Sequence, residues 1–128
     1  MVVGIGTDIV EIQRITDAVT RWGSHFLSRV YTDAEQAYCM TKHSPYQSLA
    51  ARFAAKEATI KALSPLRAEG GSVPALTDIE VLNDSTGRPH IRLYGPVRRI
   101  LRNHTLHLSI AHEKHYAVAS VVLARTGA

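Results

Sequence analysis

Cysteine is almost absent from this chain of 128 residues, and long apolar runs are missing altogether. The single cysteine, Cys39, excludes an internal disulfide framework and a cysteine-based structural zinc site, which favours a reducing compartment. No window approaches the roughly 18 apolar residues that a membrane-spanning helix needs. The first residues carry neither the basic region nor the long apolar run of a signal peptide. We therefore expect a cytoplasmic protein without a membrane partner.

Aromatic residues and several catalytic signatures are also scarce or missing. Aromatics make up 6% of the chain and do not interleave with basic residues, which argues against a nucleic-acid partner. The sequence contains no Walker loop, no Gly-x-Ser-x-Gly elbow, no His-Glu-x-x-His and no Cys-x-x-Cys. If the chain is an enzyme, we expect the nucleophile to belong to a substrate.

The remaining composition suits one folded domain. Hydrophobic residues make up 45% of the chain, and a chain of this length buries roughly two-thirds of the surface that its unfolded state exposes. No repeat or linker divides the sequence, so we expect residues 1–128 to form a single domain. Lys and Arg number 15 against 11 Asp and Glu, and the formal charge of +4 suggests an acidic partner or a phosphate-rich ligand.

The periodicity of the first half predicts one strand and three helices. Alternation predicts a strand from Val2 to Asp8, with glycines on one face. A helical stripe of apolar residues runs from Ile12 to Trp22, and the capping box Thr32–Glu35 begins a second helix. The longest helix is expected from about Tyr46 to Leu63. Its apolar stripe and its separate alanine face indicate that it is covered on two sides.

The second half is expected to be mostly strand. Ile79–Leu82 and His90–Leu93 flank a segment rich in turn-forming residues and predict a hairpin. Gly95 opens a short helix, and Leu106–Ala111 and Tyr116–Leu123 predict two further strands. The predicted fold class is α+β, with a small antiparallel sheet packed against a long central helix.

Asp8 and Glu57 are candidate metal ligands. Asp8 follows two glycines on a strand face, and Glu57 projects from the shoulder of a covered helix, so both carboxylates are expected to need a cation. Mg²⁺ accepts few carboxylates and takes other oxygens from phosphate, which suits this pair better than a calcium cage does. Two alternatives stay open. Glu57 could pair with Lys61, four residues later, and Asp8 could cap the helix that begins near Glu11.

Basic side chains interrupt the apolar stripe of the long helix. Arg52, Lys56 and Lys61 lie on this helix, and His112 follows Ser109 at the end of a late strand. Fixed cations beside a carboxylate-bound metal suit a pyrophosphate, whose charge has to be neutralised before a phosphate can leave. The alternative is a solvated basic face, which does not easily explain why the charges lie within the stripe.

Arg14 and Arg21 form a second basic feature. They lie a helical heptad apart on the exposed side of the first predicted helix. A basic ridge of this kind suits an acidic protein, although an ordinary solvated face gives the same spacing.

Two separated motifs carry a resemblance to a known family. Residues Gly4–Glu11, followed by Arg14, and residues Arg52–Ala58, with Lys61, resemble the holo-[acyl-carrier-protein] synthases, the short bacterial 4'-phosphopantetheinyl transferases. The two motifs occur in the order and at the spacing expected of that family. The resemblance extends through Asp78–Val81, the turn Gly87–Pro89 and the hairpin Ser109–Ala119.

The resemblance implies an enzyme that uses coenzyme A as co-substrate. Such enzymes move the phosphopantetheine arm of coenzyme A onto a serine of an apo acyl carrier protein and release adenosine 3',5'-bisphosphate. We expect the activity to depend on Mg²⁺ and to serve fatty acid biosynthesis. The family also implies a homotrimer with sites between subunits.

The resemblance also assigns roles to individual residues. It implies Mg²⁺ at Asp8 and Glu57, and carrier docking at Arg14 and Arg21. Catalytic roles fall to Glu57, Lys61 and His112. Contacts with coenzyme A are expected from Arg52, Lys56, Lys61, Arg88, Ser109 and His112. The general base is open among Glu57, a metal-bound water, His112 and the region of Asp33 and Glu35.

Two positions depart from the family pattern. Ser64–Gly71 replaces a short Gly-Thr-Gly turn, and we expect the segment Ser64–Ala75 to be a mobile surface loop. Ala111 replaces a hydroxyl residue that many members carry before the histidine. A function of a different class is kept as the alternative: a non-enzymatic basic module that binds an acidic protein or RNA.

Overall fold

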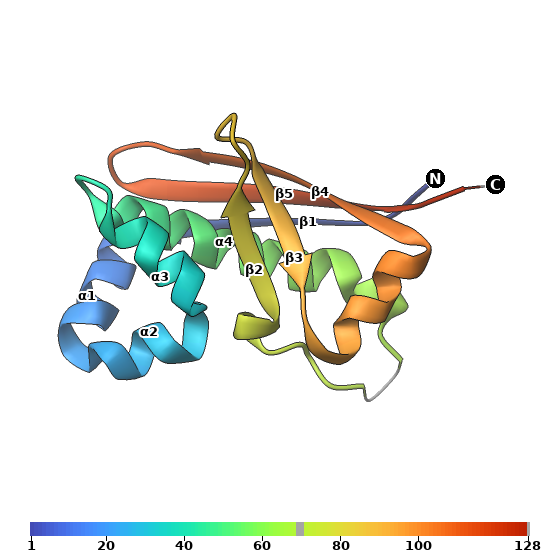
Figure 1. Ribbon diagram of the computed structural model, residues 1–128, viewed down its shortest axis with the longest axis horizontal. Helices are drawn as coiled ribbons and strands as arrows, with labels where there is room; N and C mark the ends of the chain where they lie inside the picture. The colour runs from blue at the N-terminus through green and yellow to red at the C-terminus, as the bar shows by residue number, and fades with distance from the viewer. Residues whose placement is uncertain (69–70, 128) are drawn as a thin grey trace.

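Two antiparallel sheets form the β part of the chain. The computed structural model describes residues 1–68 and 71–127. Three strands pair in the order β1-β5-β4, and β2 pairs with β3 in a hairpin. Figure 1 shows the three long strands lying side by side, with both described ends of the chain at the same end of the sheet. The strands are β1 (Val2–Glu11), β2 (Ile79–Asn83), β3 (Pro89–Leu93), β4 (His104–His112) and β5 (Tyr116–Arg125).

The helices gather on one side of the three-stranded sheet. The small helices α1 to α3 lie at one end of the molecule, while η3 lies at the other end, and α4 runs along the strands (Figure 1). The α+β class predicted from the sequence is confirmed. The helices are α1 (Ile12–Trp22), α2 (Ser24–Val30), α3 (Asp33–Met40) and α4 (Pro45–Leu63), with 3₁₀ turns η1 (Ser64–Leu66), η2 (Leu76–Asp78) and η3 (Gly95–Arg102).

Local sequence signals explain where these helices begin and end. Gly23 has a φ of 54° and separates α1 from α2, a helix that the periodicity did not predict. The capping box is formed at α3, because the Thr32 hydroxyl accepts from the Glu35 amide while the Glu35 carboxylate accepts from the Thr32 amide. Pro45 occupies the first turn of α4, where its missing N–H has no helical partner to lose.

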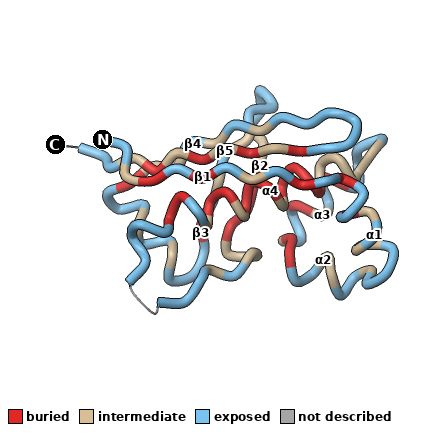
Figure 2. Tube along the Cα trace, turned by 180° about the vertical axis from the view of Figure 1, so that it is seen from behind, coloured by how far each residue is buried: buried red, intermediate tan, exposed pale blue. Residues whose placement is uncertain are grey.

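Strand β1 packs against α4 through bare backbone. A Cβ atom added at Gly4 would collide with the carbonyl oxygen of Ala62, and one added at Gly6 would collide with that of Ala58. The glycines on the strand and the alanines on the helix therefore let the two elements approach more closely than larger side chains allow. Buried residues concentrate along α4 and β5 in Figure 2.

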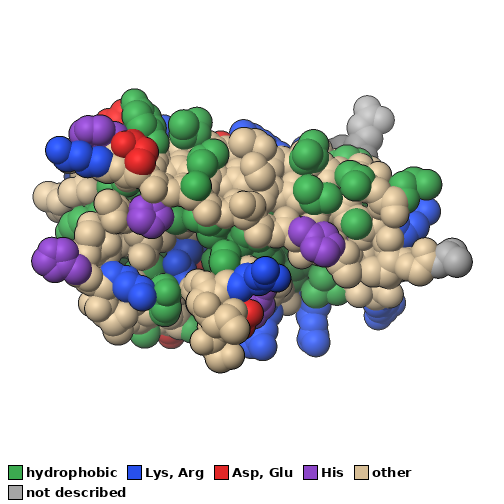
Figure 3. Space-filling model, turned by 90° about the horizontal axis from the view of Figure 1, so that it is seen from above, with side chains coloured by type: hydrophobic (Ala, Val, Ile, Leu, Met, Phe, Trp, Pro, Cys, Tyr) green, Lys and Arg blue, Asp and Glu red, His purple; other side chains and the backbone are tan. Residues whose placement is uncertain are grey.

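The opposite face of the three-stranded sheet is open in the single chain. Ile5 and Ile9 of β1 are 68% and 64% exposed, and their partners on β5 are Val122 and Val118. Figure 3 shows apolar side chains exposed at the upper surface of the molecule. Alternation predicted the strand but not that its glycine face, rather than its isoleucine face, is buried.

Three further observations concern α1, the segment after α4 and the apolarity of the helices. Trp22, predicted to belong to the apolar stripe of α1, is 54% exposed, because α1 ends beside Gly23 at the surface. The predicted loop Ser64–Ala75 begins with the 3₁₀ turn η1, and residues 69 and 70 of it lie outside the described residues. No helix among the described residues combines the length and apolarity that a bilayer crossing requires.

Candidate active site

Asp8 and Lys61 meet where β1 crosses the last turns of α4. The Lys61 ammonium donates to Asp8 Oδ1 over 3.0 Å and to the carbonyl oxygen of Thr7 over 3.0 Å. The Asp8 side chain is 21% exposed and the Lys61 side chain is 54% exposed. The glycines of β1 bring the strand onto the helix here, so that a side chain of each element reaches the other. The structure therefore brings Asp8, a proposed metal ligand, into direct contact with Lys61, a proposed phosphate contact, within the single chain.

Glu57 lies one helical turn before Lys61 and on the same flank of α4. It is half-buried, and among the described residues its carboxylate takes part in neither a salt bridge nor a side-chain hydrogen bond. The alternative pairing of Glu57 with Lys61 is contradicted, because Lys61 binds Asp8 instead. The alternative in which Asp8 caps α1 is also contradicted, since the N-cap is Glu11 and no side chain caps this helix.

The donor set at this edge fits a magnesium ion that shares its coordination with a substrate. Asp8 and Glu57 contribute carboxylate oxygens, the ligands that hard divalent cations prefer. The described residues contain no group of three or more His, Cys, Asp or Glu side chains placed to hold a metal. A cation bound by this pair would thus take its other oxygens from water or phosphate, as Mg²⁺ commonly does.

Lys56 is a structural residue, which corrects the prediction that it contacts coenzyme A. Its side chain is completely buried, and its ammonium donates to Glu35 Oε1 over 2.7 Å, to Leu76 O over 2.8 Å and to Ile79 O over 2.5 Å. All three N–H donors are therefore used inside the protein. Burial lowers the pKa of Lys56, and the Glu35 carboxylate opposes that shift.

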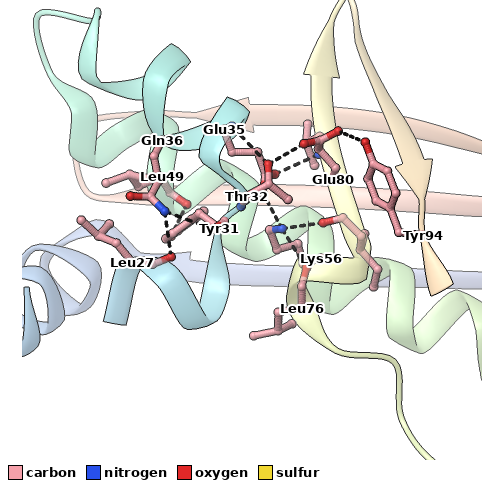
Figure 4. Close-up of polar contacts among 12 residues, drawn as sticks. Leu27, Tyr31, Thr32, Glu35, Gln36, Leu49, Lys56, Leu76, Glu80 and Tyr94 are labelled. Atoms are coloured by element: carbon pink, nitrogen blue, oxygen red, sulfur yellow. Dashed lines mark hydrogen bonds and ion pairs between the residues drawn. The ribbon is translucent and has the colours of Figure 1, made fainter. Parts of the chain in front are cut away.

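Glu35 lies at the centre of a buried polar network that joins four elements (Figure 4). Besides Lys56, its carboxylate accepts from the amides of Thr32 and Val81, each over 2.9 Å. Glu80 accepts from the Thr32 hydroxyl over 2.5 Å and from the Tyr94 hydroxyl over 2.7 Å. Because Glu35 is fully buried and its oxygens are bonded, the structure contradicts its candidacy as a general base. Asp33 remains exposed.

Arg52 is a buried cation without an acidic partner among the described residues. It is 5% exposed, its Nη2 donates to Asn83 Oδ1 over 2.6 Å, and its guanidinium carbon lies 4.5 Å from the centre of the Tyr38 ring. Within the part of the chain that the structure describes, its Nε has no hydrogen-bond partner. The Lys42 ammonium lies 4.5 Å from the same ring. The positive charge at this point is therefore compensated by a neutral amide and an aromatic ring rather than by a carboxylate.

Arg88 and Ser109 border a cavity between β3 and β4. The cavity has a volume of about 480 Å³, and its other lining residues come from the same two strands. His112 does not line it; this residue is exposed at the end of β4. Since β1 and β4 are the two edges of the sheet, Asp8 on β1 and Ser109 on β4 lie two strands apart. The candidate residues thus form two groups, one at each edge.

Comparison with known proteins identifies the family. The pattern of the 4'-phosphopantetheinyl transferase superfamily matches residues 4–121. The chain belongs to this superfamily. The holo-[acyl-carrier-protein] synthase of Halothermothrix orenii is 45% identical over 125 residues, which cover 95% of this chain and 97% of the relative. The synthase of Dehalococcoides mccartyi is 47% identical over 120 residues, covering 91% of this chain and 94% of the relative.

Solved structures of such synthases share the fold. The holo-(acyl-carrier-protein) synthase of Bacillus anthracis, in complex with CoA (3',5'-ADP), has a TM-score of 0.78 at 35% identity and covers 98% of this chain and 99% of its own. The Helicobacter pylori synthase in complex with coenzyme A has a TM-score of 0.79 at 32% identity, covering 94% and 99%. The prediction of an enzyme of this family is confirmed, and membership disfavours the non-enzymatic alternative.

Helix α1 of this superfamily member presents its two predicted docking residues to solvent. Arg14 and Arg21 are both exposed, and the Arg21 guanidinium carbon lies 4.9 Å from the centre of the Trp22 ring. Trp22 also borders a cavity of about 690 Å³ with Phe26 and Arg29 of α2. Sequence reasoning missed Trp22 as a surface residue, because its position continues the apolar stripe of the helix. Its place immediately before Gly23, at the helix end, was the available signal.

Proposed function

We propose that this chain transfers the 4'-phosphopantetheine group from coenzyme A to a serine of an apo acyl carrier protein, in a Mg²⁺-dependent reaction that serves fatty acid biosynthesis. The observation that carries the proposal is the group at the β1–α4 edge: Asp8 forms a salt bridge with Lys61, and the carboxylate of Glu57, which has no salt-bridge partner among the described residues, lies on the same flank. The coenzyme A complexes of the Bacillus anthracis and Helicobacter pylori synthases support the choice of co-substrate.

The chemistry needs no nucleophile from this chain. The carrier serine oxygen forms a bond to the phosphorus that bears pantetheine, the bond from that phosphorus to the bridging pyrophosphate oxygen breaks, and adenosine 3',5'-bisphosphate leaves. Asp8 and Glu57 would hold the divalent ion, which neutralises charge on the pyrophosphate when bound. Lys61 supplies a further positive charge for the phosphate oxygens. Glu57 and His112 are the candidates on this chain for accepting the serine proton.

Arg52 supports the binding of a phosphate-rich ligand. A guanidinium that is buried without an anion is unfavourable unless a ligand supplies the missing charge. Coenzyme A carries phosphates on both its pyrophosphate and its ribose, so a phosphate bound beside this guanidinium would supply the missing negative charge. Arg88 and Ser109 are the proposed contacts at the cavity between β3 and β4, with His112 nearby on the same strand.

We propose a homotrimer in which each site is shared by two copies. Asp8 and Lys61 lie at the β1 edge while Arg88 and Ser109 lie at the β4 edge, so one ligand reaches both groups most directly where the edges of two copies meet. The open apolar face around Ile5 and Ile9 supports burial against a further copy, because isolated monomers rarely expose such a surface.

The oligomer can be tested by sedimentation of the purified protein. The unmodified chain is expected to sediment as a trimer, and Ile5→Asp is expected to give a folded monomer that has lost activity. Val73→Asp is the matched control, because Val73 is an equally apolar, exposed residue away from the sheet. A trimer that persists in Ile5→Asp would show that this face is not the interface.

The transfer reaction is tested by mass spectrometry of a carrier incubated with coenzyme A and Mg²⁺. The carrier is expected to gain the mass of one phosphopantetheine arm. Asp8→Asn and Glu57→Gln are expected to lower the rate at least about 100-fold, because each removes a ligand of the ion that stabilises the phosphate charge. Asp17→Asn is the control, since Asp17 is an exposed carboxylate bonded only to Gln13. Full activity of either site variant, or in excess chelator, would refute the assignment.

Carrier docking is tested by reversing charge on α1. Arg14→Glu with Arg21→Glu is expected to raise the KM for an acidic carrier and to leave the KM for coenzyme A unchanged. Arg98→Glu with Arg102→Glu makes the same change in net charge on η3, at the other end of the molecule (Figure 1). Equal effects of the two pairs would mean that the carrier responds to net charge and not to α1.

A further inference from the structure

In the free chain, the Lys61 ammonium occupies the side of Asp8 at which the proposed function expects a divalent metal ion. In the free chain the Lys61 ammonium lies 3.0 Å from Asp8 Oδ1 and 3.0 Å from the Thr7 carbonyl oxygen. Two of its three donors are therefore satisfied by β1. The proposed function assigns the same carboxylate to a divalent ion. The lysine and the metal are thus candidates for one anionic position.

A double-charged ion and an ammonium group so close together repel each other. The Asp8 carboxylate attracts both, but Mg²⁺ requires oxygen ligands at about 2.0–2.1 Å in near-octahedral geometry, which leaves little tolerance for a second cation against the same group. Lys61 is the partner that can move. Its side chain is 54% exposed and its four-carbon stem is flexible, and the contacts with Thr7 and Asp8 occupy only two of its three donors.

We infer that Lys61 is the resident counterion of Asp8 in the free enzyme and that a divalent ion displaces it. The released ammonium then has a phosphate as its next available anion, so metal binding itself delivers Lys61 to the substrate. This inference rests on the metal site of the proposed function. It also explains how Asp8, a carboxylate only 21% exposed, stays paired before metal binds.

The displacement of Lys61 from Asp8 can be followed in the NMR signals of the lysine ammonium groups. The chain has four lysines, so a ¹⁵N-labelled sample gives few ammonium resonances in a proton-detected nitrogen spectrum. In the free protein the Lys61 resonance is expected to show the slow proton exchange of a hydrogen-bonded ammonium. Adding Mg²⁺ alone is expected to abolish that protection. The resonance of Lys56, whose ammonium is buried on three acceptors, is the internal control and is expected to stay unchanged.

Metal affinity gives an independent measurement. Calorimetry with Mg²⁺, without coenzyme A, is expected to show about two- to fivefold tighter binding to Lys61→Met than to the unmodified chain, the range expected for loss of a partly exposed competing ion pair. Lys61→Arg keeps the charge and binds carboxylates in a fixed fork, so its Mg²⁺ affinity is expected to be equal to or below that of the unmodified chain.

The outcomes separate this inference from the proposed function. If Mg²⁺ binds and the Lys61 ammonium stays protected from proton exchange with water, the displacement of Lys61 is wrong, whereas the metal site is supported. If neither the unmodified chain nor Lys61→Met binds Mg²⁺ in the absence of coenzyme A, displacement of Lys61 by the metal alone is wrong, and the effect of chelator on transfer decides the metal site. Transfer activity on an apo carrier decides the proposed function by itself, whichever way the ammonium spectrum turns out.

Discussion

Replacing the buried lysine Lys56 tests whether it supports the fold or binds the co-substrate. Lys56→Met removes the ammonium and leaves the carboxylate of Glu35 buried with no cation. It also removes the donor from the carbonyl oxygens of Leu76 and Ile79. Breaking a buried ion pair from one side costs about 3–5 kcal/mol. That loss is a large part of the 5–15 kcal/mol by which domains of this size are stable.

The assay is urea unfolding followed by circular dichroism, with transfer kinetics on whatever remains folded. Lys56→Met is expected to lower the free energy of unfolding by about 3–5 kcal/mol. Combining it with Glu35→Gln is expected to recover about 1–3 kcal/mol, because the uncompensated charge is gone and an amide oxygen can still accept a hydrogen bond. Lys114→Met, on the surface, is the matched control and is expected to stay within about 0.5 kcal/mol.

One result would refute this reasoning. If Lys56→Met unfolds within about 1 kcal/mol of the unmodified chain and instead raises the KM for coenzyme A, Lys56 faces the ligand and the buried network has been misinterpreted. If the double variant is as unstable as the single one, the charge of Glu35 is not what the lysine compensates.

Three other substitutions probe separate parts of the chain. Asn83→Asp gives Arg52 a carboxylate partner and is expected to raise the free energy of unfolding by about 1 kcal/mol. The same change is expected to weaken coenzyme A binding about tenfold, measured by calorimetry. Unchanged binding would show that Arg52 does not belong to the ligand site. Burial raises the pKa of the Cys39 thiol from 9.0 to about 11, so the unfolded thiol ionises first and stability is lost as pH rises from 9 to 11, by up to about 2–3 kcal/mol. Cys39→Ala is expected to flatten that part of the urea-derived stability profile, and an identical profile would contradict the pKa shift. Gly6→Ala forces a methyl group onto the Ala58 carbonyl and is expected to cost about 3 kcal/mol or more in thermal unfolding, whereas a cost below about 1 kcal/mol would mean that β1 can move away from α4.

Periodicity was sufficient for most of the architecture. The helix expected from about Tyr46 to Leu63 is present as α4, and the hairpin of β2 and β3 forms at its predicted place. These signals are local, because a run of apolar spacing or a turn sequence is read within a few residues. The strand ends were less well predicted: β1 continues to Glu11 and β4 begins at His104. Pairing with β5 supplies the hydrogen bonds that extend them; β5 is distant from β1 in the sequence and forms a hairpin with β4.

What the sequence could not supply is the identity of the partner that each side chain meets. Lys56 and Glu35 lie 21 residues apart on two different helices, so no spacing rule connects them. A lysine within an apolar stripe indicates a buried cation. The sequence pattern is the same whether that cation binds a ligand phosphate or pairs with a carboxylate elsewhere in the chain. The family resemblance assigned Asp8 to the metal and Lys61 to the phosphates, but not a bond between them. Their contact depends on the close approach of β1 to α4, where Gly4 and Gly6 leave no room for a Cβ atom.

Under the proposed assembly, the strand order of the larger sheet allows two inactive variants to complement each other. With β1 and β4 as opposite edges, a chain damaged at Asp8 keeps a sound β4 edge, and a chain damaged at Arg88 keeps a sound β1 edge. Two such inactive chains, mixed before assembly, can therefore restore each other, and random mixing in equal amounts rebuilds about one site in four from two intact edges. A trimer of either variant alone contains no such site, so activity would appear only when the two variants assemble together.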